Sequence, residues 1–205
     1  MALRVAVLLS GSGTTLQNLI DQVKAETLHA EIVCVVGSRE KAFGLERARN
    51  HGIPAVAVTP KSFADNGAFN AALWDAVRRY EPELVVLAGF MSLLTVPEDF
   101  RHRIMNVHPA LIPAFCGKGM YGHHVHEAAL EYGVKLSGCT VHFADNQYDH
   151  GPVILQRAVP VDTDDTPETL AARVFEAECE AYPEALRLIA EGRVMVEGRR
   201  VRIAT

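Results

Sequence analysis

The stretch that decides the fold class reads RVAVLLSGSGTTL and spans residues 4–16. Its first part, Arg4–Leu9, is a short apolar run that is typical of a buried β-strand. After the two glycines, apolar side chains recur at helical spacing, at Leu16, Leu19, Ile20 and Val23. A strand, a glycine loop and a helix in this order predict the opening unit of an α/β fold.

The same alternation continues through the first half of the chain. Further strands are expected at Glu31–Val36, Ala55–Val58 and Leu84–Gly89. Helices are expected near Gly44–Asn50 and over the face formed by Phe69, Leu73, Val77 and Tyr80. This pattern predicts a Rossmann-like, three-layer α/β fold with a mostly parallel central sheet. Such sheets bind ligands at the carboxyl ends of their strands.

The pattern is less regular after Gly89. Strands are expected at Arg103–Val107, Leu136–Ala144 and Val153–Val161, and a helix near Val125–Tyr132. Thr166, Pro167 and Glu168 are typical of the start of a long helix, which Pro183 is expected to kink or restart. A terminal hairpin is expected from Val194–Val196 and Arg200–Ile203. Because no repeat or linker interrupts the sequence, we expect one domain over residues 1–205.

The composition restricts the classes of function. The chain has 205 residues, of which 49% are hydrophobic, and a net charge of −5, so disorder is excluded. It has no basic block, so nothing indicates binding to nucleic acid or to a membrane surface. Its apolar runs are far shorter than the ~20 residues of a membrane helix, and we interpret the N-terminus as a strand rather than a signal peptide. Four widely spaced cysteines fit a reducing cytoplasm.

Five residues of the glycine loop are candidate ligands of a phosphate: Gly11, Ser12, Gly13, Thr14 and Thr15. Backbone N–H groups at a helix start and the helix dipole attract anions, and the hydroxyls add donors. The loop lacks the Gly-Lys-Ser/Thr ending of a Walker A motif, and Leu16 replaces the third glycine of a dinucleotide fingerprint. Arg39 could still meet the phosphate of NADP. A tight turn that needs glycine only for its geometry is the remaining interpretation.

The tetrapeptide Asn106-Val107-His108-Pro109 is the strongest candidate for a catalytic centre. Residues two apart on a strand face the same side, so Asn106 and His108 are expected to project together. An amide can hold a developing oxyanion and an imidazole can move or stabilise a proton, as acyl transfer requires. If the fold brings Asp149 to His108, its charge favours the protonated imidazole. The alternative is that these residues cap turns or fill the core.

A second histidine group, His123-His124-Val125-His126, raises the question of a metal site. His124 and His126 share a face only in a strand, and no nearby cysteine or acid completes a ligand set. The expected structure is a loop that enters a helix, with Glu127 in its first turn. We therefore expect no metal.

Together these residues resemble the phosphoribosylglycinamide formyltransferases, folate-dependent enzymes of purine synthesis, over nearly the whole chain. The Asn-x-His-Pro motif at 106–109 and the Asp-x-Gly motif at 149–151 mark the wider formyltransferase superfamily. The glycine loop and the short chain point to this branch of it. Other shared stretches are Phe43–Ala48, Leu87–Met91 and Gly138–Phe143.

The resemblance implies where the substrates bind. The N-terminal half takes phosphoribosylglycinamide, with its phosphate in the glycine loop, and Glu178 contacts the sugar. The C-terminal half takes the cosubstrate, 10-formyltetrahydrofolate, and carries catalysis. The matching folate-binding residues are Met91, Ser92, Leu93, Leu94 and Asn106. This chain departs from the family pattern at Ser92 and Asn66, where arginines often bind the folate's glutamate tail.

The resemblance also implies a mechanism of direct formyl transfer. The substrate amine attacks the formyl carbon while Asn106 donates a hydrogen bond to the oxyanion. Protonated His108 stabilises that charge and passes a proton to the leaving nitrogen, and Asp149 keeps His108 protonated. No metal or covalent enzyme intermediate is implied. The expected partners are these small molecules, in the cytoplasm, and the chain is a monomer or a homodimer.

Other functions remain open at this stage. A formyltetrahydrofolate hydrolase shares the catalytic residues but usually carries an additional N-terminal domain, for which we expect no room before Arg4. Formylation of initiator methionyl-tRNA is disfavoured because that family has a further C-terminal domain and this chain has no basic surface signal. An NADP-binding oxidoreductase could use Gly11, Gly13 and Arg39, but it leaves Asn106 and His108 unexplained. A noncatalytic phosphate-binding module is the last alternative.

Overall fold

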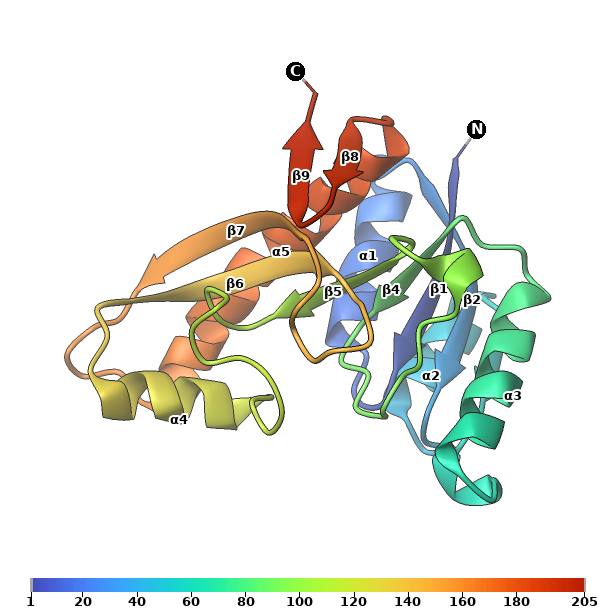
Figure 1. The fold of residues 1–205 in the computed structure, drawn as a ribbon, viewed down its shortest axis with the longest axis horizontal. Helices are drawn as coiled ribbons and strands as arrows, with labels where there is room; N and C mark the ends of the chain where they lie inside the picture. The colour runs from blue at the N-terminus through green and yellow to red at the C-terminus, as the bar shows by residue number, and fades with distance from the viewer. Residues whose placement is uncertain (1, 205) are drawn as a thin grey trace. The chain divides into compact units, whose positions relative to one another are not determined.

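Alternating strands and helices build the first of two compact units, as the sequence predicts (Figure 1). The computed structural model describes residues 2–204. The first unit ends at Met105, and the second begins at Asn106. Its strands are β1 (Leu3–Leu9), β2 (Ala30–Gly37), β3 (Ala55–Ala57) and β4 (Leu84–Leu87). Its helices are α1 (Thr14–Lys24), α2 (Phe43–Asn50) and α3 (Asn66–Arg78), with 3₁₀ turns at Pro60–Ser62 and Glu98–Phe100.

The strands of the first unit form a parallel sheet in the order β3-β2-β1-β4. Every residue of β4 and most of those of β1 and β2 are buried. Continuous burial explains why these strands read as apolar runs and not as alternating patterns, because a parallel sheet is covered on both faces. The carboxyl ends of these strands therefore meet at one edge, where the loops that follow them carry the candidate ligand-binding residues.

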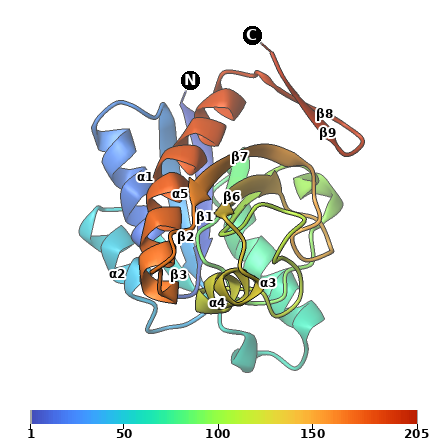
Figure 2. The ribbon, with the colours of Figure 1, turned by 90° about the vertical axis from the view of Figure 1, so that its left-hand side faces the viewer.

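The second unit combines an antiparallel strand pair with a long helix (Figures 1 and 2). β5 (Ile104–His108) crosses the junction at residue 105. The elements that follow are α4 (His123–Tyr132), β6 (Leu136–Phe143), β7 (Val153–Pro160), α5 (Pro167–Ala190), β8 (Val194–Glu197) and β9 (Arg200–Ile203). α5 packs against α4, β6 and β7. β6 and β7 pair antiparallel, and β8 and β9 form the expected hairpin.

The start of α5 is the capping arrangement that the sequence predicts, and the restart, one of the two expectations at Pro183, does not occur. The Thr166 hydroxyl accepts from Thr169 N, and the Thr169 hydroxyl accepts in return from Thr166 N. The helix then continues through Pro183 to Ala190 without a restart. The proline removes one backbone donor, but its neighbour Tyr182 is fully buried, so tertiary packing holds the helix together.

Smaller differences lie at element ends. Tyr80 falls beyond the end of α3, and Gly89 falls beyond the end of β4, where its φ of 72° is left-handed.

Among residues 2–204, no helix combines the length and apolar character that a membrane span requires.

Gly13 is the position where the fold most clearly requires glycine. Its φ is 72°, and a Cβ placed there would lie 2.5 Å from Gly44 Cα. A left-handed alanine alone costs roughly 1–2 kcal/mol. We expect Gly13→Ala to lower the free energy of unfolding by at least about 2 kcal/mol, measured by denaturant titration.

Gly11→Ala is the matched control, since a Cβ at Gly11 meets no heavy atom within 4 Å. Its effect should stay below about 1 kcal/mol. Equal losses of stability in the two variants would contradict this account of the loop.

Candidate active site

The glycine loop joins β1 to α1 and leaves the start of the helix without a side-chain cap. Gly13, the residue before α1, has no side chain to accept from the first-turn N–H groups. The loop is held from α2, where Arg47 Nε donates to Ser12 O at 2.9 Å and Gly44 N donates to Gly11 O at 3.1 Å. A helix N-terminus beside a guanidinium group is suited to an anion.

The carboxyl ends of three strands are tied together next to this loop. Ser10 Oγ lies 2.6 Å from Ser38 Oγ and accepts from Met91 N at 2.8 Å. Both serines are buried. Either hydroxyl of this pair is able to donate to the other. The predicted phosphate loop and the predicted folate loop therefore start from the same hydrogen-bonded edge of the first unit.

The predicted folate loop, Met91–Leu94, is anchored by α3. The buried Asn70 side chain donates to Leu93 O at 3.2 Å and accepts from Thr95 N at 2.7 Å. Trp74 Nε1 donates to Thr95 O at 2.8 Å. Met91 and Leu93 are nonetheless about half exposed. A fixed loop that keeps apolar side chains in solvent offers a surface to an apolar or aromatic ligand.

In the second unit the structure brings His108 and Asp149 together. His108 Nδ1 lies 3.6 Å from Asp149 Oδ2, with side-chain exposures of 4% and 12%. The opposite ring nitrogen, His108 Nε2, lies 2.8 Å from Phe115 O and donates to it. Asp149 Oδ2 also accepts from Gly117 N at 2.8 Å. The imidazole therefore lies between a carboxylate and a carbonyl that accepts its Nε2 hydrogen.

Asn106 joins this group through His142, a residue that our sequence analysis did not select. Asn106 Nδ2 lies 3.2 Å from His142 Nε2, and His142 Nδ1 lies 2.9 Å from Phe143 O. Burial lowers the pKa of His142, so it is neutral. With its hydrogen on Nδ1, it accepts from Asn106 through Nε2. One amide hydrogen of Asn106 is thereby fixed, which orients the second for a substrate oxygen.

The backbone around Asp149 explains the Asp-x-Gly motif. Asp149 has a φ of 53°, a left-handed conformation that is costly for a non-glycine residue. A Cβ at Gly151 would lie 1.7 Å from Phe143 O, so only glycine fits. This close approach brings the loop back to the end of β6. There Asp149 Oδ1 lies 3.9 Å from His142 Nε2.

A buried threonine shapes the loop that follows His108. Thr140 Oγ1 donates to Ala110 O at 2.7 Å and accepts from Ile112 N at 3.0 Å. Gln156 Nε2 donates to Ile112 O at 3.0 Å. The Ile112–Pro113 peptide bond is cis. These contacts fix the chain on its way to Phe115, whose carbonyl holds His108.

Glu178, the predicted sugar ligand, lies on α5. Burial raises the pKa of its carboxyl to about 7. Its charge raises the pKa of the neighbouring Cys139 thiol, for which burial is the larger cause. A carboxyl in this partly exposed position is able to accept from hydroxyl groups through either oxygen.

The histidines at 123–126 lie at the start of α4 and not in a strand. His124 Nδ1 lies 3.2 Å from Glu127 Oε2 on the surface, whereas His126 is buried. Burial lowers the pKa of His126. The described part of the chain contains no group of three histidine, cysteine or acidic side chains arranged for a metal ion.

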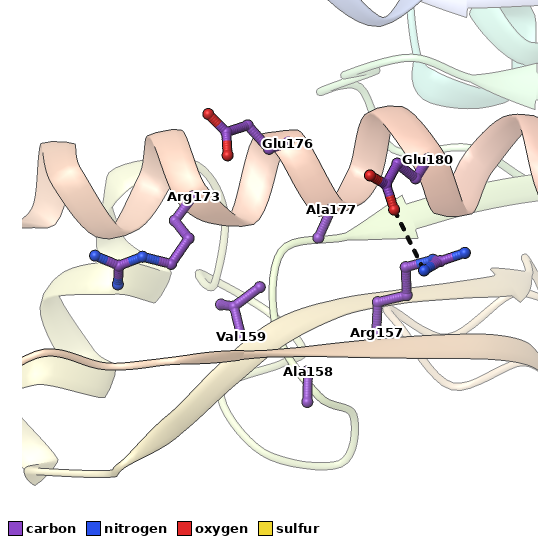
Figure 3. A pocket seen from close by; sticks show the side chains of 7 residues that line it. All are labelled: Arg157, Ala158, Val159, Arg173, Glu176, Ala177 and Glu180. Atoms are coloured by element: carbon purple, nitrogen blue, oxygen red, sulfur yellow. Dashed lines mark ion pairs between the residues drawn. The ribbon is translucent and has the colours of Figure 1, made fainter.

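A shallow groove of about 470 Å³ lies between α5 and β7, apart from the predicted site residues (Figure 3). Its two arginines are already paired. Arg157 contacts Glu180 at 3.3 Å and also Glu184, and Arg173 contacts Asp162 and Asp165. The groove therefore offers no unpaired cation to an anionic ligand.

Comparison with known proteins places this geometry in a family. Residues 3–186 match the family described as formyl transferase. The chain therefore belongs to the formyl transferase family.

Two relatives resemble the chain over most of its length. The trifunctional purine biosynthetic protein adenosine-3 of Gallus gallus is 43% identical over 195 residues, which are 94% of this chain and 19% of that protein. The chain thus spans about a fifth of this curated relative. The crystal structure of glycinamide ribonucleotide transformylase 1 from Symbiobacterium toebii is 45% identical, with a TM-score of 0.94 over 100% of this chain and 95% of that one. The expected α/β class with a mostly parallel sheet is therefore confirmed.

A third similar structure has a different activity in its name. A formyltetrahydrofolate deformylase from Pseudomonas syringae is 25% identical, with a TM-score of 0.89 over 100% of this chain and 67% of that one.

The burial of Glu178 makes stability depend on pH. Its folded-state pKa of about 7 lies above the ordinary value of about 4.5, so the folded state binds its proton more tightly. The free energy of unfolding should therefore fall as the pH rises through this window, by up to about 3 kcal/mol. Glu178→Gln should remove this fall, as measured by denaturant titration near pH 5 and near pH 8.

The control is Glu176→Gln, which changes an exposed carboxyl two residues earlier on the same helix. This variant should keep the wild-type dependence on pH. If Glu178→Gln also keeps it, the carboxyl is not the buried acid that the structure indicates.

Proposed function

We propose that this chain transfers the formyl group of 10-formyltetrahydrofolate to the amine of N1-(5-phosphoribosyl)glycinamide, a step of de novo purine synthesis. The products are formylglycinamide ribonucleotide and tetrahydrofolate. The observation that carries the proposal is the buried group in which His108 faces Asp149 while His142 orients Asn106. The names of the similar proteins from Gallus gallus and Symbiobacterium toebii support the choice of substrate.

Asn106 and His108 act on the charge that develops during transfer. When the amine attacks the formyl carbon, the carbonyl oxygen becomes negative, and the second amide hydrogen of Asn106 donates to it. The His108 imidazolium stabilises the same charge and supplies the proton that the leaving folate nitrogen requires. The attacking amine loses one proton as the new C–N bond forms, and transfer of that proton to His108 restores the imidazolium. The Asn106 amide is oriented before substrate binds by its contact with His142, whereas His108 Nε2–H donates to Phe115 O and must leave that carbonyl to reach the folate nitrogen.

Asp149 serves His108 in this mechanism. Its carboxylate lies on the Nδ1 side of the ring and favours the imidazolium. The Gly117 N–H holds the carboxylate in place. Since an amide donor and a cation stabilise the oxyanion, the proposed reaction requires no metal.

The remaining predicted residues bind the two substrates. The loop from Gly11 to Thr15 binds the phosphate at the start of α1. Glu178 accepts from the sugar hydroxyls, and Met91–Leu94 contact the folate together with Asn106. We further propose that residues 1–205 function as one formyltransferase domain, as a monomer or a homodimer. The four free cysteines fit a cytoplasmic location.

The second candidate is hydrolysis of the formyl group, favoured by the likeness to the Pseudomonas syringae deformylase. The two reactions share the oxyanion and differ in the nucleophile, which is an amine in one and water in the other. The glycine loop at the start of α1 favours the transferase, because the acceptor of a transferase carries a phosphate that this loop is suited to bind.

Release of the formyl group from a 10-formylfolate, followed by absorbance, tests the proposal. We expect release with N1-(5-phosphoribosyl)glycinamide present and none when it is left out. Equal release in both conditions would make the chain a hydrolase. If the folded protein releases no formyl group in either condition, the proposed function is wrong.

Two substitutions test the assigned donors in the same assay. We expect Asn106→Ala to lower kcat by roughly 10²–10³-fold, the usual loss for one oxyanion donor. His108→Gln should lower it by roughly 10²–10⁴-fold, because the proton donor is lost. Circular dichroism and thermal melting check that both variants fold.

The control is His124→Ala, which removes an exposed imidazole outside the proposed site. It should keep the wild-type rate. Normal kcat in folded Asn106→Ala would remove that side chain from its assigned role.

A further inference from the structure

A set of contacts reaches the segment around Asp149 from the C-terminal hairpin. We define residues 144–151, between β6 and β7, as the aspartate loop. The hairpin follows α5, and β9 packs against β7 (Figures 1 and 2). In its turn, Arg199 Nη1 lies 2.8 Å from His150 Nε2 and 3.2 Å from His150 Nδ1. The hairpin thus contacts the residue that directly follows the candidate catalytic carboxylate.

His150 also contacts Asp145, which lies near the other end of the aspartate loop. Its Nδ1 lies 2.9 Å from Asp145 Oδ2. Because a carboxylate only accepts, His150 Nδ1 donates to Asp145, and the Arg199 guanidinium faces the opposite nitrogen, Nε2. The second oxygen, Asp145 Oδ1, accepts from Gln147 N at 2.8 Å. Asp145 therefore closes the turn and ties its two ends together.

These contacts lie next to Asp149, whose backbone has an unusual conformation. Its φ of 53° lies in the left-handed region, which residues other than glycine adopt rarely. Two residues after Asp149, Gly151 is held by its close fit to Phe143 O. Between them, His150 is held by its contacts with Asp145 and Arg199. Without that anchor the backbone of Asp149 is free to relax.

We propose that Arg199 is a positioning residue, and that the C-terminal hairpin holds the aspartate loop so that Asp149 stays beside His108. The role in catalysis rests on the proposed function, whereas the effect on the loop does not. The family match ends at residue 186, before the hairpin begins at Val194. The hairpin thus lies outside the segment that the family match covers.

The size of the effect follows from the exposure of these groups. His150 and Asp145 side chains are 46% and 39% exposed, and contacts between exposed charged groups change an equilibrium by up to about fivefold. We therefore expect Arg199→Ala to lower kcat roughly two- to fivefold. The KM for the phosphoribosyl substrate should stay unchanged, because the loop holds the carboxylate that assists catalysis.

Matched variants separate positioning from a general effect on the hairpin. Arg202→Ala removes a charge that pairs with Glu197 at 2.8 Å inside the hairpin, and it should keep the wild-type kcat. Arg199→Lys, which retains a cationic donor, should recover part of the lost rate. Because Arg199 acts through His150, the double variant with His150→Ala should be no slower than His150→Ala alone.

Hydrogen exchange provides a readout that does not depend on activity. The backbone amides of residues 144–151 should exchange faster in Arg199→Ala than in the wild type, and Arg202→Ala should leave them unchanged. If the wild type transfers no formyl group, the proposed function fails, and the exchange rates still decide the role of the hairpin. Unchanged exchange in Arg199→Ala, or losses of kcat that multiply in the double variant, would overturn the inference.

Discussion

The second unit depends on one constraint, the withdrawal of a carboxylate from water. Asp149 is mostly buried, and an ion in that position is stable only when other groups replace its hydration. Gly117 N–H supplies a hydrogen bond, and two imidazoles lie within 4 Å. Burial lowers the pKa of His142, and its imidazole lies 3.9 Å from the carboxylate, against 3.6 Å for His108. The two histidines therefore differ in role, since His142 orients Asn106 and His108 faces Asp149.

Backbone groups hold several of the candidate site residues in position. Side chains that are distant in the sequence fix these backbone groups in turn. Phe115 O and Gly117 N reach the site because Thr140 and Gln156 fix the preceding segment at Ile112. In the first unit, the side chain of Asn70 serves the predicted folate loop in the same way. Each candidate loop is thus built on a polar side chain from a regular element, which gives a loop the rigidity that a binding site needs.

The sequence is informative where one local property decides the outcome. Buried parallel strands read as apolar runs, and Gly13 reads as a helix start because a left-handed turn there requires glycine. The sequence also indicates Asn106 and His108 through their spacing on a strand. His142 and Thr140 escape prediction because an inward polar residue on a buried strand looks like any other until its partner is known. The helix does not restart at Pro183, because packing outweighs the lost hydrogen bond.

The position of Cys116 has a practical consequence for chemical labelling. Cys116 is partly exposed and lies between Phe115 and Gly117, the two residues whose backbone groups hold His108 and Asp149. Burial raises the pKa of the Cys116 thiol as well as those of Cys34 and Cys139, but Cys34 and Cys139 are fully buried, so a labelling reagent does not reach them. With Cys179 replaced, a maleimide fluorophore would attach at Cys116 alone. Its emission would then report in real time on the segment that closes around the imidazole.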